Sequence, residues 1–162
     1  GEGGKVGACE MVVLVGWPAS GKSTLAERDF ATRGYVRVNQ DTLGTPAKCL
    51  AACKEALSKG RSCVVDNTNP TAKKREEFLK VAQQHKVPAR VLWMASERDL
   101  AEHLNKLRGF KGGARIPTIA YNVFNKNFED PREEEGFVSV TRMPFNPHFD
   151  TPEDRERFQW RL

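Results

Sequence analysis

The stretch from Gly16 to Ser23 constrains the fold of this chain more than any other part of the sequence. It reads Gly-Trp-Pro-Ala-Ser-Gly-Lys-Ser and fits the phosphate-binding pattern G-x-x-x-x-G-K-[ST] without a gap. Residues 11–15 before it form an apolar run of strand length, and residues 24–30 after it look helical. The motif therefore lies at a strand-to-helix turn, where backbone N–H groups and the helix dipole favour an anion.

The residue types of this loop predict how it holds a nucleotide. The Lys22 ammonium can reach the β- and γ-phosphates, and the Ser23 hydroxyl can ligate Mg²⁺. We therefore predict ATP and Mg²⁺ as ligands. The predicted nucleotide-binding residues of the loop are Gly16, Ala19, Ser20, Gly21, Lys22, Ser23 and Thr24.

Length and composition fit a single domain. A chain of 162 residues suffices to bury a core without help from disulfides or metals. Its 26 Lys and Arg against 21 Asp and Glu give a net charge of +5, which permits an anionic partner. We interpret the Gly-rich residues 1–10 as a flexible leader and residues 11–162 as the domain. Because the chain begins with Gly1 and not with Met, we expect a fragment of a longer protein.

The sequence also argues against several classes of protein. No stretch reaches the roughly 18 apolar residues of a membrane span, and no signal peptide opens the chain, so we expect an intracellular protein that does not contact a membrane. The four cysteines form neither a C-x-x-C pair nor a zinc-site spacing, and we interpret them as reduced thiols. They are Cys9, Cys49, Cys53 and Cys63.

Strand and helix patterns alternate along the chain. Strands are predicted at residues 11–15, 35–38, 63–65, 89–94 and 137–141. Helices are predicted from the phosphate loop to Arg33, from Thr45 to Gly60, after Pro70 to Gln84, from Ser96 onward, over 118–128 and from Thr151 onward. This alternation indicates a three-layer α/β fold of the P-loop kinase type, with a mostly parallel sheet of about five strands and helices on both faces.

Two aspartates follow the second and third predicted strands. Ligands of parallel sheets collect at the carboxyl ends of the strands, so Asp41, Asp66 and the phosphate loop should meet in one crevice. Phosphoryl transfer needs the phosphates held, their charge neutralised and the attacking oxygen relieved of its proton. We predict that Ser23 and Asp66 serve the metal and that Asp41 is the catalytic base.

A basic, glycine-rich segment predicts a lid. Lys106 and Arg108 precede the loop Gly109–Arg115, which carries three glycines and two further basic residues. Such a segment can close over a nucleotide and stabilise charge on the transferring group. We therefore predict Lys106 and Arg108 as nucleotide-binding residues, and Arg108 as catalytic together with Lys22 and Asp41.

Three motifs in this order resemble the kinase domain of the eukaryotic polynucleotide kinase-phosphatases. They are Gly16–Thr24, Tyr35–Gly44 and Val64–Pro70. Weaker similarity continues through His103–Arg108, Glu135–Phe137 and Met143–Phe145, so that the resemblance covers nearly everything after the leader.

This resemblance implies a P-loop polynucleotide kinase domain at residues 11–162, which transfers the γ-phosphate of ATP to a 5′-hydroxyl end of DNA or RNA in the repair of strand breaks. In the family, the aspartate matching Asp41 activates the 5′-hydroxyl, and the residues matching Lys22, Ser23 and Arg108 serve the ATP phosphates and the metal. The resemblance further implies a nuclear protein, DNA as the favoured partner, and a phosphatase domain in the full-length chain. We expect a monomer.

Two positions depart from the family pattern. Gln40 stands where the family usually has arginine, so a cationic contact near the acceptor end is missing. Lys106 replaces a further lid arginine, which keeps the charge but loses the planar fork that binds phosphate through two hydrogen bonds.

Two other functions remain open at this point. The same phosphate loop and acceptor aspartate serve kinases of small molecules and nucleosides. A nucleotide-dependent switch or a nucleic-acid-binding module without catalysis would also bind ATP, although the presence of Asp41 argues against it. Phosphorylation of a polynucleotide should weaken as salt screens its phosphate contacts, whereas metabolite phosphorylation should respond far less.

Overall fold

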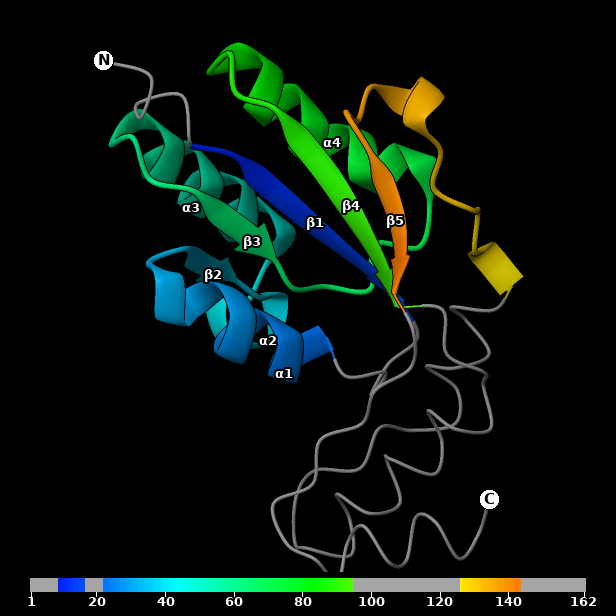
Figure 1. The fold of residues 1–162 in the computed structure, drawn as a ribbon, viewed down its shortest axis with the longest axis horizontal. Helices are drawn as coiled ribbons and strands as arrows, with labels where there is room; N and C mark the ends of the chain where they lie inside the picture. The colour runs from blue at the N-terminus through cyan, green and yellow to red at the C-terminus, as the bar shows by residue number, and fades with distance from the viewer. Residues whose placement is uncertain (1–8, 17–21, 95–125, 144–162) are drawn as a thin grey trace, which may run out of the picture.

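Five parallel strands form one sheet in this protein. The computed structural model describes residues 9–16, 22–94 and 126–143, and the structural statements below concern these residues. The strands are β1 (Met11–Gly16), β2 (Val36–Val38), β3 (Cys63–Val65), β4 (Ala89–Met94) and β5 (Val140–Met143). Their order in the sheet is β2-β3-β1-β4-β5, and every neighbouring pair is parallel (Figure 1). The predicted parallel sheet is confirmed.

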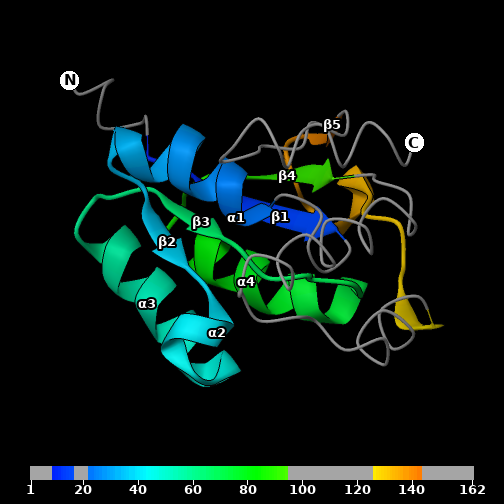
Figure 2. The same cartoon turned by 90° about the horizontal axis from the view of Figure 1, so that it is seen from below.

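Helices cover both faces of this sheet, as predicted. They are α1 (Lys22–Leu25), a π-helical turn η2 (Ala26–Phe30), a 3₁₀ turn η3 (Ala31–Arg33), α2 (Gln40–Leu43), α3 (Pro46–Ser58), α4 (Ala72–Gln84) and a second 3₁₀ turn η4 (Glu133–Glu135). Helices α3 and α4 lie on one face, whereas α1 and η2 lie on the other (Figure 2). None of the helices in the described ranges is long and apolar enough to cross a membrane.

The central strand β1 explains the unbroken apolar run in the sequence, because every one of its residues is buried. Met11, Val13 and Val15 enter a large core shared with α3 and α4. Val12 and Leu14 point to the opposite face and pack in a smaller core with Phe30. A strand that is covered on both faces has no polar side and therefore shows no alternation.

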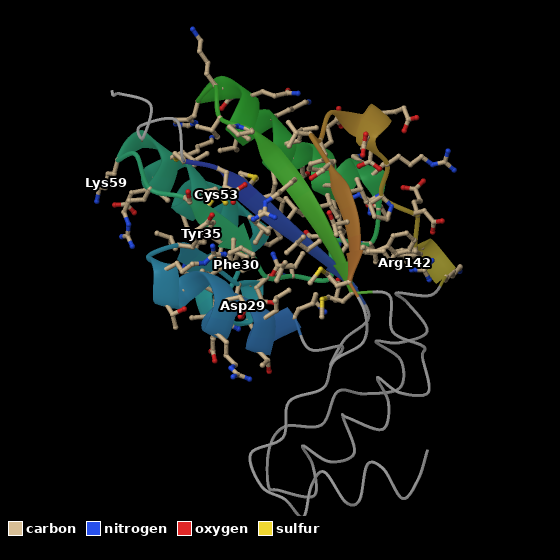
Figure 3. The ribbon with its side chains drawn as sticks, in the orientation of Figure 1. Asp29, Phe30, Tyr35, Cys53, Lys59 and Arg142 are labelled. Carbon is tan, nitrogen blue, oxygen red and sulfur yellow. The ribbon has the colours of Figure 1, made fainter. Side chains whose placement is uncertain are left out.

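Aromatic packing closes the smaller core at its edge. The rings of Phe30 and Tyr35 lie 5.1 Å apart between centroids, and Figure 3 shows the two side chains next to each other. The guanidinium of Arg33 lies 5.1 Å from the centre of the Phe30 ring. These contacts anchor the turn that leads from η3 into β2.

The predicted helix ends are found where the sequence signals place them. Gly34 follows η3 with φ +91°, in the left-handed region that favours glycine, as expected for a residue that ends a helix. Thr45 caps α3 by accepting a hydrogen bond from the Lys48 N–H at 3.1 Å, with Pro46 in the first helical position. The helix predicted after the phosphate loop is not a regular α-helix up to Arg33. After α1 it continues as the π turn η2 and the 3₁₀ turn η3.

The fifth strand lies later than predicted, at Val140–Met143 instead of 137–141. Phe137 precedes the strand and is apolar for a different reason, because it is buried in the large core. Gly136 has φ +126°, and its position is so close to Leu79 that a Cβ there would lie 2.7 Å from the leucine side chain. Packing against α4 therefore determines this stretch, and regular pairing with β4 follows it.

The cysteines are free thiols, as predicted. Cys49, Cys53 and Cys63 are buried in the large core, and Cys9 is partly buried. Burial raises the pKa of the Cys49 thiol.

Several expectations fall outside the described residues. These are the interior of the phosphate loop (17–21), the first eight residues of the leader, the helix beginning at Ser96, the lid with Lys106 and Arg108, most of the helix over 118–128, and the helix beginning at Thr151.

Candidate active site

The carboxyl ends of β1, β2 and β3 lie at one end of the sheet (Figure 1), and Gly16, Asp41 and Asp66 lie at or just after these ends. Gly16 ends β1 and its N–H donates to the Thr68 carbonyl in the loop after β3, at 3.2 Å. The phosphate loop is thus attached to the loop that follows Asp66. In a parallel α/β sheet, ligands bind at this carboxyl end of the strands.

Lys22 is buried at the start of α1, with an exposed fraction of 7%. Its ammonium donates a hydrogen bond to the Gly16 carbonyl at 3.2 Å, so the side chain turns back toward the point where the loop leaves β1. A lysine in this place is positioned to meet phosphates held by the loop. Ala19, Ser20 and Gly21 lie outside the described residues, so their predicted contacts have no structural description.

Asp66 follows directly after β3 and is almost completely buried, with an exposed fraction of 2%. Its main chain is held by the end of β2. The Asp66 N–H donates to the Val38 carbonyl at 2.7 Å, and the Asn39 side-chain amide donates to the Asp66 carbonyl at 2.6 Å. Two bonds to adjacent residues fix the position of this aspartate.

The Asp66 carboxylate pairs with Arg37 on β2. The Nε and Nη2 atoms of Arg37 approach the same oxygen, Oδ2, at 2.8 and 2.7 Å. Burial raises the pKa of Asp66, although the hydrogen bonds and charge of Arg37, the charge of Lys22 and a hydrogen bond from Ser23 act in the opposite direction. The carboxylate thus lies among the groups of the phosphate loop, as expected for a residue that serves its metal.

Ser23 and Thr24 occupy the first turn of α1 and are partly buried. The Ser23 hydroxyl accepts a hydrogen bond from Arg37 Nη2 at 3.3 Å. Arg37 therefore contacts both groups that the sequence predicts for the metal, Ser23 and Asp66.

Asp41 lies in the first turn of α2, a four-residue helix where the sequence predicts the end of a strand. Asn39 caps this helix, since its Oδ1 accepts from the Thr42 N–H at 3.1 Å. The Gln40 N–H donates to Asn67 Oδ1 at 2.8 Å, which attaches α2 to the loop after β3. The Asp41 side chain is exposed at this junction and is accessible to an acceptor.

A pocket of about 420 Å³ opens beside α2. Gln40 and Pro46 form part of its wall, and the loop after β3 together with the first turns of α4 forms the rest. Its polar lining includes Asn67, Thr68, Lys73 and Lys74. The pocket therefore offers hydrogen-bonding groups, two lysines and one carboxylate, that of Glu77, next to the residue that precedes Asp41.

A buried network supports the loop after β3. Asn69 has φ +47° and an exposed fraction of 3%, and its side-chain amide donates to the Leu14 carbonyl at 2.7 Å. Its own carbonyl accepts from Arg75 Nη1 at 2.9 Å. Arg75 is fully buried and pairs with Glu135 through two bonds of 3.0 Å each.

Sequence reasoning missed the residues that hold the two aspartates. Arg37 carries a charge in the middle of a short apolar strand, and Asn39 stands in a position suited to cap a helix that begins at Gln40. Both signals are present in the sequence. Arg75 has no such local signal, because its partner Glu135 lies 60 residues further along the chain.

Comparison with known proteins identifies the family. Residues 11–131 match the family described as AAA domain. The chain belongs to the AAA domain family.

Two curated relatives are similar to this chain in sequence. The chain is 47% identical over 137 residues to the bifunctional polynucleotide phosphatase/kinase of Schizosaccharomyces pombe, which covers 84% of this chain and 34% of that protein. It is 39% identical over 140 residues to the putative bifunctional polynucleotide phosphatase/kinase of Acanthamoeba polyphaga mimivirus. This match covers 84% of this chain and 33% of that protein. The resemblance noted from the motifs is confirmed, and the chain spans about a third of the length of these relatives.

Solved structures confirm the fold of this AAA domain. Kti12 of Chaetomium thermophilum, in complex with ADP-AlF3, superposes with a TM-score of 0.72 at 17% identity, covering 93% of this chain and 96% of that one. A gluconokinase of Sinorhizobium meliloti 1021 gives 0.60 at 19% identity, with 93% and 87% coverage. The APS kinase CysC of Mycobacterium tuberculosis gives 0.55 at 15% identity, with 94% coverage of both chains. The predicted P-loop kinase fold is correct.

Proposed function

We propose that this chain is an ATP-dependent kinase that transfers the γ-phosphate to the 5′-hydroxyl end of a polynucleotide, with DNA favoured over RNA. The observation that carries the proposal is that Asn39 connects, by hydrogen bonds, the two segments that hold Asp66 and Asp41. Asp66, beside the phosphate loop, and α2, which carries Asp41, are held together through Asn39. The similarity to two polynucleotide phosphatase/kinases supports the same activity and acceptor.

The residues of the phosphate loop are proposed to bind the nucleotide. Lys22 balances phosphate charge from its buried position, and the backbone of Gly16 to Ser23 binds the phosphate oxygens. The further nucleotide-binding residues in this proposal are Ala19, Ser20, Gly21, Thr24, Lys106 and Arg108. Arg108 stabilises the charge of the group in transfer.

The donor set fits Mg²⁺. In the described ranges, no three His, Cys, Asp or Glu side chains gather around a common point, so no metal cage made of protein groups alone is found there. Mg²⁺ prefers one or two protein oxygen ligands together with waters and substrate phosphates. The Ser23 hydroxyl would bind the ion directly, and Asp66 would orient its water shell. When bound, the ion neutralises charge on the phosphates.

On the acceptor side, Asp41 accepts the proton of the 5′-hydroxyl as that oxygen attacks the γ-phosphate. The bond between the oxygen and phosphorus forms as the bond from the γ-phosphorus to ADP breaks. The pocket beside Gln40 would receive the terminal nucleotide, since Asn67 and Thr68 can donate and accept hydrogen bonds there. Lys73 and Lys74 supply positive charge toward the strand.

The biological setting is part of the same proposal. An enzyme of this kind prepares broken strands for joining, so we propose a nuclear protein that acts in DNA repair. Because the chain spans about a third of the curated relatives, we also propose that a phosphatase domain belongs to the full-length protein. We propose that the kinase domain is a monomer.

A direct test compares acceptors under one set of conditions. The protein is incubated with labelled ATP and Mg²⁺ and with 5′-hydroxyl DNA, 5′-hydroxyl RNA or a panel of nucleosides and small polyols. The proposal expects label on the oligonucleotides, and transfer that weakens as salt rises. Transfer to nucleosides or polyols alone, without dependence on salt, would replace it by the small-molecule kinase alternative. ATP binding without transfer to any acceptor would indicate a switch.

A further inference from the structure

Arg37 contacts the two groups predicted for the metal, Asp66 and Ser23, and also the exposed Glu27, which lies outside that site. Its guanidinium contacts Asp66 Oδ2 through Nε and Nη2, the Ser23 hydroxyl through Nη2 at 3.3 Å, and Glu27 Oε2 through Nη1 at 3.1 Å. The Asp66 side chain has an exposed fraction of 1%, whereas those of Arg37 and Glu27 have 26% and 63%. The contacts of Arg37 thus run from a buried carboxylate to an exposed one.

We propose that Arg37 is a positioning residue for the Mg²⁺–nucleotide site, which acts by orienting the Asp66 carboxylate and holding it next to the Ser23 hydroxyl. This inference rests on the proposed function, because it assigns Arg37 to the same site. It extends that function to a residue outside the phosphate loop, the two aspartates and the lid.

The geometry of the pair supports positioning. Both nitrogens of Arg37 converge on Oδ2, and this leaves Oδ1 outside the contact. A bidentate pair would instead occupy both carboxylate oxygens. Oδ1 is therefore the oxygen that Asp66 can offer to the water shell of the metal, while Oδ2 fixes its orientation.

The main chain around Asp66 does not depend on Arg37. Its N–H bonds to the Val38 carbonyl and its carbonyl accepts from Asn39, so the backbone position is fixed by two other contacts. Replacement of Arg37 should therefore free the carboxylate to rotate without detaching it from the end of β2. A residue behind a metal-binding group commonly changes metal affinity by about 10- to 100-fold when it is replaced.

The test measures nucleotide binding as a function of Mg²⁺, by calorimetry or with a fluorescent ATP analogue, in the whole chain. For Arg37→Ala, the Mg²⁺ concentration at half-maximal stimulation of binding should rise by about 10- to 100-fold. Binding in EDTA should stay within about twofold of the wild type, because Lys22 and the phosphate loop are unchanged.

Two further variants separate geometry from charge. Arg37→Lys keeps the positive charge but cannot place two nitrogens on Oδ2, so its Mg²⁺ midpoint should also rise. This variant carries the test if Arg37→Ala does not fold. Glu27→Gln removes the exposed partner of Arg37 and should leave the midpoint at the wild-type value.

The results that overturn the inference are distinct from those that overturn the proposed function. An unchanged Mg²⁺ midpoint in both Arg37 variants, or an equal loss of binding in EDTA and in Mg²⁺, would reject the positioning role. Wild-type protein whose nucleotide binding ignores Mg²⁺ would reject it as well. If wild-type protein binds Mg²⁺ and ATP but phosphorylates no 5′-hydroxyl end, the acceptor is wrong and the role of Arg37 still stands.

Discussion

The side-chain amide of Asn39 donates a hydrogen bond to the main-chain carbonyl of Asp66 at 2.6 Å. The other end of the same side chain, Oδ1, accepts from the Thr42 N–H at 3.1 Å and caps α2. One asparagine therefore fixes the spacing between the buried aspartate beside the phosphate loop and the helix that carries Asp41. A substrate that contacts both groups therefore meets a site whose two parts are linked through one side chain.

Asp41→Asn should separate nucleotide binding from acceptor activation. The change keeps the size of the side chain and removes the base, so the transfer rate to a 5′-hydroxyl oligonucleotide should fall by roughly 10²-fold or more. ATP affinity, measured by calorimetry, should stay near the wild-type value because the proposed role of the exposed Asp41 is to act on the acceptor hydroxyl and not on ATP. An active Asp41→Asn enzyme would disprove its role as the base.

Asp66→Asn should give a different phenotype. A side chain that orients the water shell of Mg²⁺ affects the use of Mg²⁺ and ATP, and added Mg²⁺ should restore part of the rate. The measurement is the transfer rate over a series of Mg²⁺ concentrations, with Asp41→Asn as the matched control that Mg²⁺ does not rescue. If only Asp41→Asn responds to Mg²⁺, the two roles are exchanged.

Lys22→Ala should abolish transfer. Its ammonium is buried beside Gly16, where it can meet the phosphates in the bound and the transition state. Loss of one preorganised charge contact of this kind costs on the order of 10² to 10³ in rate. Steady-state kinetics with a saturating oligonucleotide measure the effect, and Lys48→Ala on the exposed side of α3 serves as a control. More than about a tenth of the activity left would contradict the assignment.

Glu10 should make the stability of the fold depend on pH. Its carboxylate accepts from Arg90 Nε and Nη2 at 2.9 and 3.0 Å and from the Tyr35 hydroxyl at 2.6 Å. Burial raises the pKa of Glu10, but these hydrogen bonds and the charge of Arg90 outweigh burial and leave the pKa below its usual value. A lowered pKa in the folded state means that the pairing stabilises the fold above the ordinary pKa of glutamate, and that this stabilisation is lost as the pH falls through the lowered value.

The comparison of wild type with Glu10→Gln measures that contribution. At pH 7 the free energy of unfolding should drop by about 1.5 kcal/mol, as expected for hydrogen bonds to a charged group. The difference should shrink as the pH falls from about 4, where glutamate in the unfolded chain becomes protonated, through the lowered pKa of Glu10 in the folded state. Urea denaturation over a range of pH provides the test. A difference that grows toward acid pH would contradict the direction of the shift.

Glu135→Ala should destabilise the domain strongly. It removes the counter-charge of Arg75, which is fully buried, and an unpaired buried charge costs about 3–5 kcal/mol. The neighbouring Glu134 is exposed, so Glu134→Ala should change the free energy of unfolding by less than about 0.5 kcal/mol. Chemical denaturation measures the free energy of unfolding of both variants. Equal losses in the two would show that the Arg75–Glu135 pair does not stabilise this region.

The sequence was most informative where a local pattern has a local cause. The apolar run of β1, the glycine after η3 and the Thr45-Pro46 helix start all reflect conformations or burial that their own residue types favour. The phosphate loop could be placed for the same reason, because its spacing, its strand and its helix are contiguous.

The residues that support the site could not be predicted in this way. Arg37 meets Asp66 across 29 positions, and Arg75 meets Glu135 across 60, so neither pairing leaves a periodic signal. The start of β5 was misplaced for a related reason, since Phe137 is apolar because it packs in the core and not because it belongs to a strand. Such contacts are set by the assembled fold.

The pairing of Arg75 with Glu135 also sets an order of events during synthesis. When β1, α3 and α4 have been synthesised, much of the core is present. Glu135, the partner of Arg75, is synthesised 60 residues after it. Burying the charge of Arg75 alone would cost several kcal/mol. The packing of α4 against the sheet therefore reaches its full stability only after Glu135 has been synthesised, long after the phosphate loop.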